Sequence, residues 1–314
     1  MTLHALLLAA GLGTRLRPLT DHLPKPLVPL FDRPLAAYAL AELKRAGVTH
    51  VVANTHHLAA TVDPALRPWA ERLGLTFDTR FEPQLLGTGG ALRNVLDAMT
   101  DPFIVYNGDV LATPDLAGAL ALHRASDAEL TMVLREDPRA ARLGAIEVNA
   151  RGEVLRILGE GETPREPVKS CLFTGIYVVS KRLSGLLPAE GCVVRHTVRR
   201  LLSSGRRVAG FVDPGLWHDL GTHAAYAEVH RAALDGALAP LRGYAAENAL
   251  AAGVTAPAGV SLSGCVLGAG VRVEGAGALR GVIAWPGVTV RAPLENAIVG
   301  PFGVVLGEKM VERA

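Results

Sequence analysis

The first half of this chain alternates short apolar runs with segments of helical periodicity, and this alternation restricts the possible folds more than any other feature. Residues 3–10 (LHALLLAA) are apolar almost throughout and stop at Gly11, which is typical of a strand buried on both faces of a sheet. Residues 34–46 carry apolar side chains at helical spacing and stop at Gly47, and residues 48–54 form a second apolar run. This order of strand, helix and strand predicts a βαβ unit.

The same alternation continues over the next hundred residues. It predicts helices over 64–73, 90–99 and 115–125, and strands over 74–81, 102–106 and 129–135. Strands that alternate with helices indicate an α/β fold with a mostly parallel sheet. Ligands bind beyond the carboxyl ends of the strands in such sheets. We therefore expect residues 11–15 and residues 107–109, each just after a predicted strand, to face one crevice.

Beyond about residue 250 the sequence changes character. Residues 253–306 carry small and β-branched side chains, frequent glycines and apolar positions spaced about six apart, with no helical period. This spacing predicts a short β-solenoid, and a small β-sandwich or a pair of hairpins is the alternative. We expect an α/β domain over 1–235, a linker helix over 236–252 and a solenoid domain over 253–314.

Composition excludes several classes of protein. The 314 residues allow about two domains, and 49% hydrophobic residues against 20% charged ones exclude a mostly disordered chain. The 32 basic and 30 acidic residues leave a net charge of +2 with no block of like charge, which argues against nucleic acid as a partner.

The cysteines and the hydropathy pattern predict a cytoplasmic protein. Cys171, Cys192 and Cys265 are far apart and lack a C-x-x-C spacing, so neither a disulfide framework nor a zinc site is indicated. The apolar run at the start of the chain is much shorter than the ~20 residues needed to span a bilayer. We therefore expect a reducing compartment and no membrane partner.

The segment that follows the first predicted strand has the chemistry of a phosphate site. It reads AAGLGTRLRPLTDHLPKPL from Ala9. Gly11 and Gly13 allow a sharp turn in which backbone N–H groups point at phosphate oxygens. Arg15 can place two donors on a pyrophosphate, and Lys25 can place a compact charge on another phosphate. A G-x-G alone also fits a plain strand-to-helix turn, and the segment is neither a Walker loop nor a full dinucleotide fingerprint.

The complete string resembles the signature of the sugar-nucleotide pyrophosphorylases, the nucleotidyltransferases that make NDP-sugars from an NTP and a sugar 1-phosphate. That signature is G-x-G-T/S-R followed by P-K-P, and it is matched by Gly11, Gly13, Thr14, Arg15, Pro24, Lys25 and Pro26. Further matching segments are VVANTHHL (51–58), EPQLLGTGGAL (82–92), NGD (107–109), FTGIYV (173–178) and WHDLGT (217–222). The resemblance covers the whole chain. It implies a Rossmann-like nucleotidyltransferase domain followed by the short left-handed β-helix that some members carry.

Asp109 and Asp219 each follow a predicted strand and match the family's metal-binding aspartates. Carboxylate oxygens suit Mg²⁺, which binds a few carboxylates together with substrate phosphates. An aspartate after a strand is also a common cap or turn residue, and the context of Trp217 and Gly221 favours the metal for Asp219. We therefore expect Mg²⁺ as cofactor, with Asp109 and Asp219 as its ligands.

The implied reaction is attack by an oxygen of the sugar 1-phosphate on the α-phosphorus of the NTP, with pyrophosphate as leaving group. The nucleophile is already an anion at neutral pH, so no general base is needed and the obstacle is repulsion between phosphates. We expect Arg15, Lys25 and Asp109 to be the catalytic residues. In this hypothesis Arg15 stabilises the pyrophosphate, Lys25 spans the sugar phosphate and the α-phosphate, and Asp109 binds the metal.

The resemblance assigns the nucleotide to three segments, in which the binding residues are Ala10, Gly11, Gly13, Thr14, Arg15, Glu82, Gly87, Thr88 and Asp109. Glu82 stands where thymidylyl-transferring relatives typically have glutamine. A carboxylate only accepts hydrogen bonds, and guanine offers N1–H and N2–H₂ side by side, which favours GTP. Some uridylyl-transferring relatives also keep an acid here, so UTP or dTTP stays open, and a solvated strand end is the structural alternative for Glu82.

For the sugar phosphate, the resemblance assigns Lys25, Gly144, Glu160, Thr174, Gly175 and Asp219. The family usually carries E-K-P between the LGAI and FTGI segments, whereas this chain reads GEGETP over 159–164. Glu160 or Glu162 is then the acid that binds sugar hydroxyls. The members that transfer guanylyl to mannose 1-phosphate fit best, and glucose 1-phosphate or an amino sugar phosphate is the alternative.

Other candidates receive structural or surface roles. We expect His56 and His57 to be structural, and the arginines at 199, 200, 206 and 207 to form a solvated surface. A regulatory subunit that binds sugar nucleotides without turnover is the alternative from another class, and the joint presence of Arg15, Lys25, Asp109 and Asp219 favours an enzyme. The partners expected are an NTP, a sugar 1-phosphate and further copies of the chain, joined through the C-terminal domain.

Overall fold

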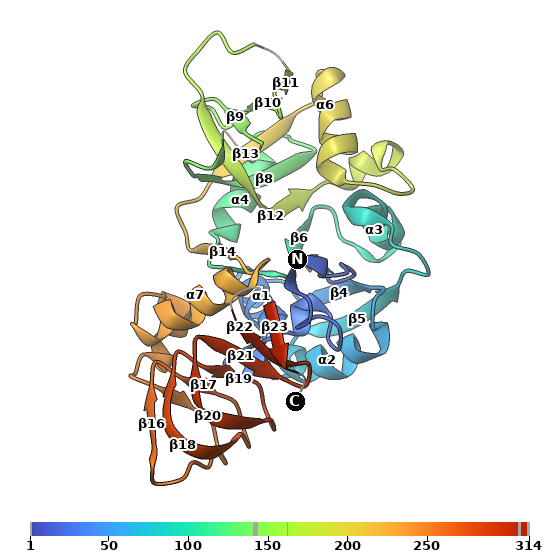
Figure 1. Cartoon of the computed structure of the whole chain (residues 1–314). Coiled ribbons are helices and arrows are strands. Elements are labelled where there is room, and N and C mark those ends of the chain that lie inside the picture. Colours follow the sequence, from blue (N-terminus) through green and yellow to red (C-terminus); the bar gives the residue numbers. More distant parts are fainter. Residues whose placement is uncertain (1, 141–143, 162, 307–308, 313–314) are drawn as a thin grey trace. The chain divides into compact units, whose positions relative to one another are not determined.

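The computed structural model describes residues 2–140, 144–161, 163–306 and 309–312 (Figure 1). Contacts within the chain group it into two compact units. The first unit combines the start of the chain, up to Gly11, with Ala36–Trp217, and the second combines Leu12–Leu35 with the chain from His218 onward.

Four parallel strands form one half of the large sheet in the first unit. They lie in the order β6 (Phe103–Asn107), β1 (His4–Leu8), β4 (His50–Thr55), β5 (Thr76–Phe81). Leu8 is paired with Asn54 on one side and Asn107 on the other, so the three strands end at the same edge. The centre of β1 has no exposed surface, as its apolar sequence predicts. The expected βαβ order is confirmed.

Helices are present at the predicted segments, and one short helix, Arg199–Ser203, was not predicted. They are α1 (Leu35–Arg45), α2 (Val62–Arg72), α3 (Gly87–Val95), α4 (Leu116–Ala125) and α6 (Arg199–Ser203), with shorter turns at Ala59–Thr61, Leu96–Ala98, Lys181–Leu186 and Val194–Val198. Asp115 caps α4 by accepting a hydrogen bond from the Gly118 amide at 2.9 Å. Helix α3 begins three residues before the expected start, because Gly87–Gly90 pack against backbone near Gly191 where side chains would collide.

The other half of the sheet is mainly antiparallel, which the strand–helix alternation did not predict. It contains β8 (Leu130–Glu136), β9 (Ile146–Val148), β10 (Val154–Ile157), β11 (Glu160–Gly161), β12 (Lys169–Val179) and β13 (Val208–Val212). The long strand β12 runs antiparallel to β6, β8 and β9, whereas β13 is parallel to β8. The sheet is therefore mixed within the expected α/β class. Two further strands are short, β7 (Val110–Ala112) and β14 (Trp217–Asp219), and the division between the units falls after Trp217 in β14.

The second unit contains helix α7 (His223–Leu234), the hairpin β2 (Pro29–Leu30) and β3 (Arg33–Pro34), and short 3₁₀ turns at Thr14–Leu16, Lys25–Leu27 and Ala239–Tyr244. The last of these turns stands where a linker helix was expected over 236–252. Pro240 lies in its first turn and cannot donate a helical hydrogen bond. The region forms one short 3₁₀ turn instead of a long helix.

Most of the C-terminal strands of the second unit form stacked coils, and the last two add an antiparallel edge. They are β15 (Ala249–Leu250), β16 (Val260–Ser263), β17 (Val266–Leu267), β18 (Arg272–Arg280), β19 (Ile283–Ala284), β20 (Thr289–Glu295), β21 (Ala297–Gly300), β22 (Gly303–Leu306) and β23 (Lys309–Glu312). Strands β15, β17, β19 and β21 pair in parallel, as do β16, β18 and β20. Val271, Val282 and Val290, three of the periodic valines, lie in the buried core between the coils. The expected β-helix architecture is confirmed.

The helices in the described part of the chain are too short or too polar to cross a lipid bilayer.

Candidate active site

The glycine loop adopts a conformation that exposes Arg15. Gly13 has a φ of +62°, in the left-handed region that favours glycine. A Cβ atom at this position would lie 2.9 Å from the Thr20 side chain, and the Thr20 hydroxyl donates a hydrogen bond to the Gly13 carbonyl at 2.9 Å. The turn Thr14–Leu16 follows directly, and the Arg15 side chain is 67% exposed. The loop thus presents a guanidinium group to solvent.

Arg15, Lys25 and Asp219 come together in the second unit. The Lys25 ammonium donates to one oxygen of the Asp219 carboxylate at 3.3 Å, and the Arg15 guanidinium lies 3.7 Å from the other oxygen. A Cβ atom at Gly221 would lie 2.9 Å from the Arg15 guanidinium, so the guanidinium packs close to this glycine. Two cations beside one carboxylate carry a net charge of +1, which suits a phosphate ligand.

Lys25 owes its position to the P-K-P sequence. Pro24 and Pro26 flank it in the turn Lys25–Leu27, and all three residues are buried. A buried ammonium is costly unless it is paired, and the Asp219 carboxylate supplies a partner. The lysine is therefore held in a fixed place, while the Arg15 side chain is exposed.

Asp109 lies in the first unit, in the turn between β6 and β7. The amide of Gly108 donates to the carbonyl of Leu8 at 2.9 Å, which ties this turn to the end of β1. The Asp109 side chain is partly exposed. Its carboxylate thus stands at the edge where the parallel strands end, as expected from the N-G-D segment.

The two aspartates suit a divalent metal by their chemistry. Among the described residues, no group of three or more His, Cys, Asp and Glu side chains could hold an ion. Mg²⁺ typically binds one or two carboxylates and completes its shell with water and substrate phosphates. Asp109 and Asp219 each carry a carboxylate of the kind that such an ion binds. Their joint coordination stays a prediction.

Glu82 is fully buried, and its carboxylate is engaged within the protein. Oε1 accepts a hydrogen bond from the Asn54 side-chain amide at 2.8 Å, and Oε2 accepts one from the Leu86 backbone amide at 3.1 Å. The His56 ring contacts the Glu82 carbonyl at 2.8 Å, a structural contact of the kind expected for this histidine. That Glu82 reads the base stays a prediction.

The residues expected at the sugar phosphate have different surroundings. The Thr174 hydroxyl is buried and donates to the Val133 carbonyl at 2.7 Å, and Gly175 lies where the register between β12 and β8 shifts. Gly144 is partly exposed. Glu160 forms an ion pair with Arg199, and Glu162 lies outside the described residues. Their contact with a sugar stays a prediction.

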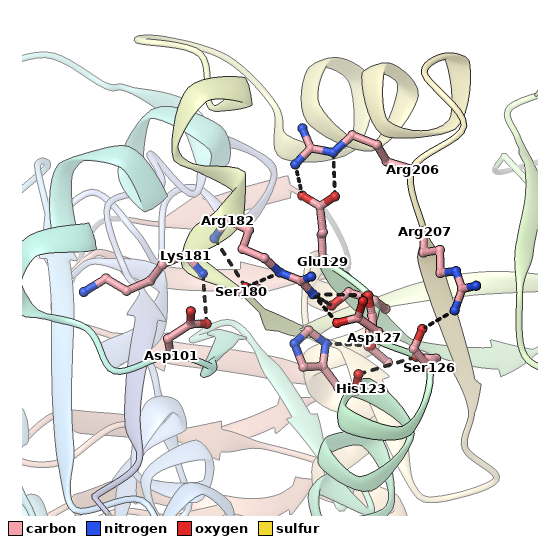
Figure 2. Close-up of polar contacts among 12 residues, drawn as sticks. Asp101, His123, Ser126, Asp127, Glu129, Ser180, Lys181, Arg182, Arg206 and Arg207 are labelled. Atoms are coloured by element: carbon pink, nitrogen blue, oxygen red, sulfur yellow. Dashed lines mark hydrogen bonds and ion pairs between the residues drawn. The ribbon is translucent and has the colours of Figure 1, made fainter.

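A second polar cluster, distinct from the expected site, surrounds the start of β8 (Figure 2). Arg206 forms two hydrogen bonds with the carboxylate of Glu129, whose side chain is only 10% exposed. Arg182 donates to the Ser180 hydroxyl at 3.2 Å and to the Ala128 carbonyl at 3.2 Å. Arg206 therefore has a structural contact where a solvated surface was expected.

His123 belongs to the same cluster. Its Nδ1 lies 2.9 Å from the Thr131 hydroxyl. Burial, the largest effect, and the nearby Arg182 together lower the pKa of His123 to about 4. In the second unit, burial likewise lowers the pKa of His230 to about 4. Both histidines are neutral at physiological pH, as expected of groups with a packing role.

Sequence reasoning missed Asn54 and Glu129. Asn54 was only part of a matching segment, although an asparagine at the end of a buried strand needs hydrogen-bond partners and this need was a usable signal. The pairing of Glu129 with Arg206 had no sequence signal, because 77 residues separate the two.

The comparisons with known proteins define the class. The family described as nucleotidyl transferase matches residues 4–236. This chain belongs to that family and is an enzyme of the nucleotidyltransferase class. Nucleotidyl transfer in the family generally uses a divalent metal.

Individual relatives and a solved structure give the extent of the similarity. The chain is 32% identical over 298 residues to mannose-1-phosphate guanylyltransferase of Mycobacterium tuberculosis, covering 92% of this chain and 81% of that protein. It is 28% identical over 320 residues to probable mannose-1-phosphate guanylyltransferase 3 of Oryza sativa subsp. japonica, covering 94% and 85%. The crystal structure of HddC from Yersinia pseudotuberculosis complexed with GMP-PN aligns with a TM-score of 0.60 at 22% identity, over 72% of this chain and 97% of that chain. This last likeness supports the fold.

Proposed function

We propose that this protein transfers a guanylyl group from GTP to mannose 1-phosphate in the presence of Mg²⁺, giving GDP-mannose and pyrophosphate. The observation that carries the proposal is the cluster of Arg15, Lys25 and Asp219, which gathers two cations beside the glycine loop. The similarity to enzymes named mannose-1-phosphate guanylyltransferase over more than nine tenths of the chain supports the choice of substrates.

In the proposed reaction, an oxygen of mannose 1-phosphate forms a bond to the α-phosphorus of GTP while the bond to the departing pyrophosphate breaks. Bound Mg²⁺ would neutralise phosphate charge, with Asp109 and Asp219 as its ligands. Arg15 is exposed and has several N–H donors, which suit the pyrophosphate. Lys25 is fixed by Asp219 and supplies a compact charge for the phosphates that must meet.

The nucleotide base and the sugar are the finer parts of the proposal. The names of the relatives support guanine and mannose, and uridylyl or thymidylyl transfer to glucose 1-phosphate or an amino sugar phosphate is the alternative. Glu160, proposed for the sugar hydroxyls, is 54% exposed, so a ligand can reach it when its pairing with Arg199 opens.

Release of pyrophosphate from a panel of NTPs and sugar 1-phosphates with Mg²⁺ tests the proposal. We expect GTP with mannose 1-phosphate to give the highest kcat/KM, and EDTA to abolish the release. Release with UTP or dTTP alone would overturn guanylyl transfer. No release with any pair would favour the alternative of a non-catalytic subunit that binds sugar nucleotides.

Two further parts of the proposal concern assembly and location. We propose a homo-oligomer that forms through the C-terminal β-helix, and a cytoplasmic location in which the free thiols of Cys171, Cys192 and Cys265 stay reduced. Light scattering of the full chain tests the first part, and a mass equal to the 33.0 kDa of one chain at micromolar concentration would contradict it.

A further inference from the structure

A continuous set of buried hydrogen bonds links three strand ends in the first unit. The Ala9 backbone amide donates to Asn54 Oδ1 at 2.8 Å, and Asn54 Nδ2 donates to Glu82 Oε1 at 2.8 Å. The Leu86 backbone amide then donates to Glu82 Oε2 at 3.1 Å. Asn54 is 4% exposed and Glu82 has no exposed surface. We call this set the Asn54–Glu82 relay.

The relay joins the two backbone segments expected to hold the nucleotide. Ala9 follows β1 and opens the glycine loop, and Leu86 immediately precedes α3, which begins with Gly87 and Thr88. The backbone amides of Ala9 and Leu86 both donate to a side chain and not to a neighbouring strand. The relay therefore sets the distance between these two segments. Leu86 is also held from its other side, because its carbonyl accepts a hydrogen bond from the Gly191 amide at 2.8 Å.

We propose that Asn54 and Glu82 are positioning residues, which fix the distance between the end of β1, at Ala9, and the start of α3 and do not touch the base. This inference rests on the proposed nucleotidyl transfer. Each oxygen of the Glu82 carboxylate already has a donor, and the group is closed to solvent. A change at Glu82 then affects turnover with every nucleotide, because it alters the positions of these two backbone segments.

The donor and acceptor roles in the relay account for an asparagine at position 54 and a glutamate at position 82. Asn54 must accept from Ala9 and donate to Glu82, and Glu82 must accept twice. In Glu82→Gln, an amide NH₂ has to face either Asn54 Nδ2 or the Leu86 N–H. Flipping the Asn54 amide only moves the conflict to the Ala9 N–H. No arrangement satisfies all the donors, and a buried conflict of this kind is costly.

A double variant that exchanges the amide and the carboxylate between positions 54 and 82 tests this arrangement. In the double variant Asn54→Asp with Glu82→Gln, the aspartate accepts from Ala9 and from the new glutamine, and the glutamine accepts from Leu86. All three hydrogen bonds and the single negative charge return with the central bond reversed. We expect Glu82→Gln to lower kcat/KM by about 10- to 100-fold, and the double variant to recover most of this loss.

Nucleotide preference separates positioning from reading of the base. For a positioning residue, Glu82→Gln lowers kcat/KM with GTP and dTTP by the same factor. A shift of preference from GTP toward dTTP would overturn the proposal and show that Glu82 contacts the base. A double variant no better than Glu82→Gln would also overturn it.

A control variant and a second measurement keep the test independent of folding and of activity. Glu153→Gln changes another glutamate that accepts from an asparagine amide, Asn149 at 2.8 Å, in a turn between β9 and β10, and it should leave kcat/KM unchanged. Amide hydrogen exchange at Leu86 should become faster in Glu82→Gln and return toward the wild-type rate in the double variant. Unchanged exchange in Glu82→Gln would overturn the relay. If the wild type releases no pyrophosphate, the proposed function fails, whereas the exchange rates still test the relay.

Discussion

Two carboxylates of this protein are used in opposite ways. Asp219 is 38% exposed and faces two cations at 3.3 and 3.7 Å, whereas Glu82 has no exposed surface and accepts hydrogen bonds from Asn54 and Leu86. The first arrangement leaves charge accessible to a ligand, and the second orders two backbone segments. From this difference we expect substitutions in the exposed cluster to lower the rate of turnover, whereas substitutions in buried pairs should affect geometry or stability.

The largest effect is expected for Asp109→Asn. Asp109 is partly exposed like Asp219, and the substitution removes the charge that a divalent metal needs. Turnover in the pyrophosphate assay should disappear, while the thermal unfolding midpoint stays that of the wild type. An unchanged rate would remove Asp109 from the metal site.

A smaller loss is expected for Arg15→Ala. Removing one preorganised charge from the phosphates costs on the order of 10²–10³-fold in kcat. Arg17 is a matched control in the same loop, because its side chain is 57% exposed and also pairs with an aspartate, Asp21. Arg17→Ala should keep wild-type kcat. Equal losses in the two variants would mean that loop charge in general, and not the Asp219 cluster, supports turnover.

Arg206→Met should lower stability and leave the chemistry unchanged. The substitution leaves the Glu129 carboxylate, 10% exposed, without the guanidinium that holds it (Figure 2). Breaking such a pair costs about 3 kcal/mol in the free energy of unfolding, measured by denaturant titration. Lys169→Met breaks an exposed pair with Glu136, and solvent screening should make its cost clearly smaller. A greater loss of kcat than of stability in Arg206→Met would contradict a structural role.

The smallest effect is expected on the free energy of unfolding when the pH is lowered. Burial lowers the pKa of His123 and of His230 from 6.5 to about 4, so between these values the unfolded chain binds protons that the folded chain does not. This contribution to the free energy of unfolding is fully present above pH 6.5 and is lost as the pH falls toward 4. Denaturant titrations at pH 7 and pH 5 should show the decrease. His123→Gln should make it smaller, and an equal decrease in this variant would contradict the assignment for His123.

The sequence predicted the elements whose pattern is local. The run of residues 3–10 became β1, the spacing over 34–46 became α1, and the valine spacing beyond residue 250 became stacked coils. Strand direction in the second half of the sheet was not predictable, because the nearly continuous buried run along β12 suits parallel and antiparallel partners alike. The early start of α3 was missed because glycines disfavour a helix until backbone near Gly191 packs against them.

The residues of the candidate site were predictable where they belong to short sequence motifs. The G-x-G-T-R and P-K-P segments and Asp219 were expected to act together, and the structure places Arg15 and Lys25 beside Asp219. The engagement of Glu82 could not be predicted, because it depends on the register of β4 with β5, which brings Asn54 next to that strand's end.

The decisive experiment is a crystal structure of the protein with GDP-mannose and Mg²⁺. We expect the diphosphate to contact Arg15 and Lys25, the metal to be bound by Asp109 and Asp219, and the Glu82 carboxylate still to accept from Asn54 and Leu86. A diphosphate bound away from Arg15 and Lys25 would contradict this expectation.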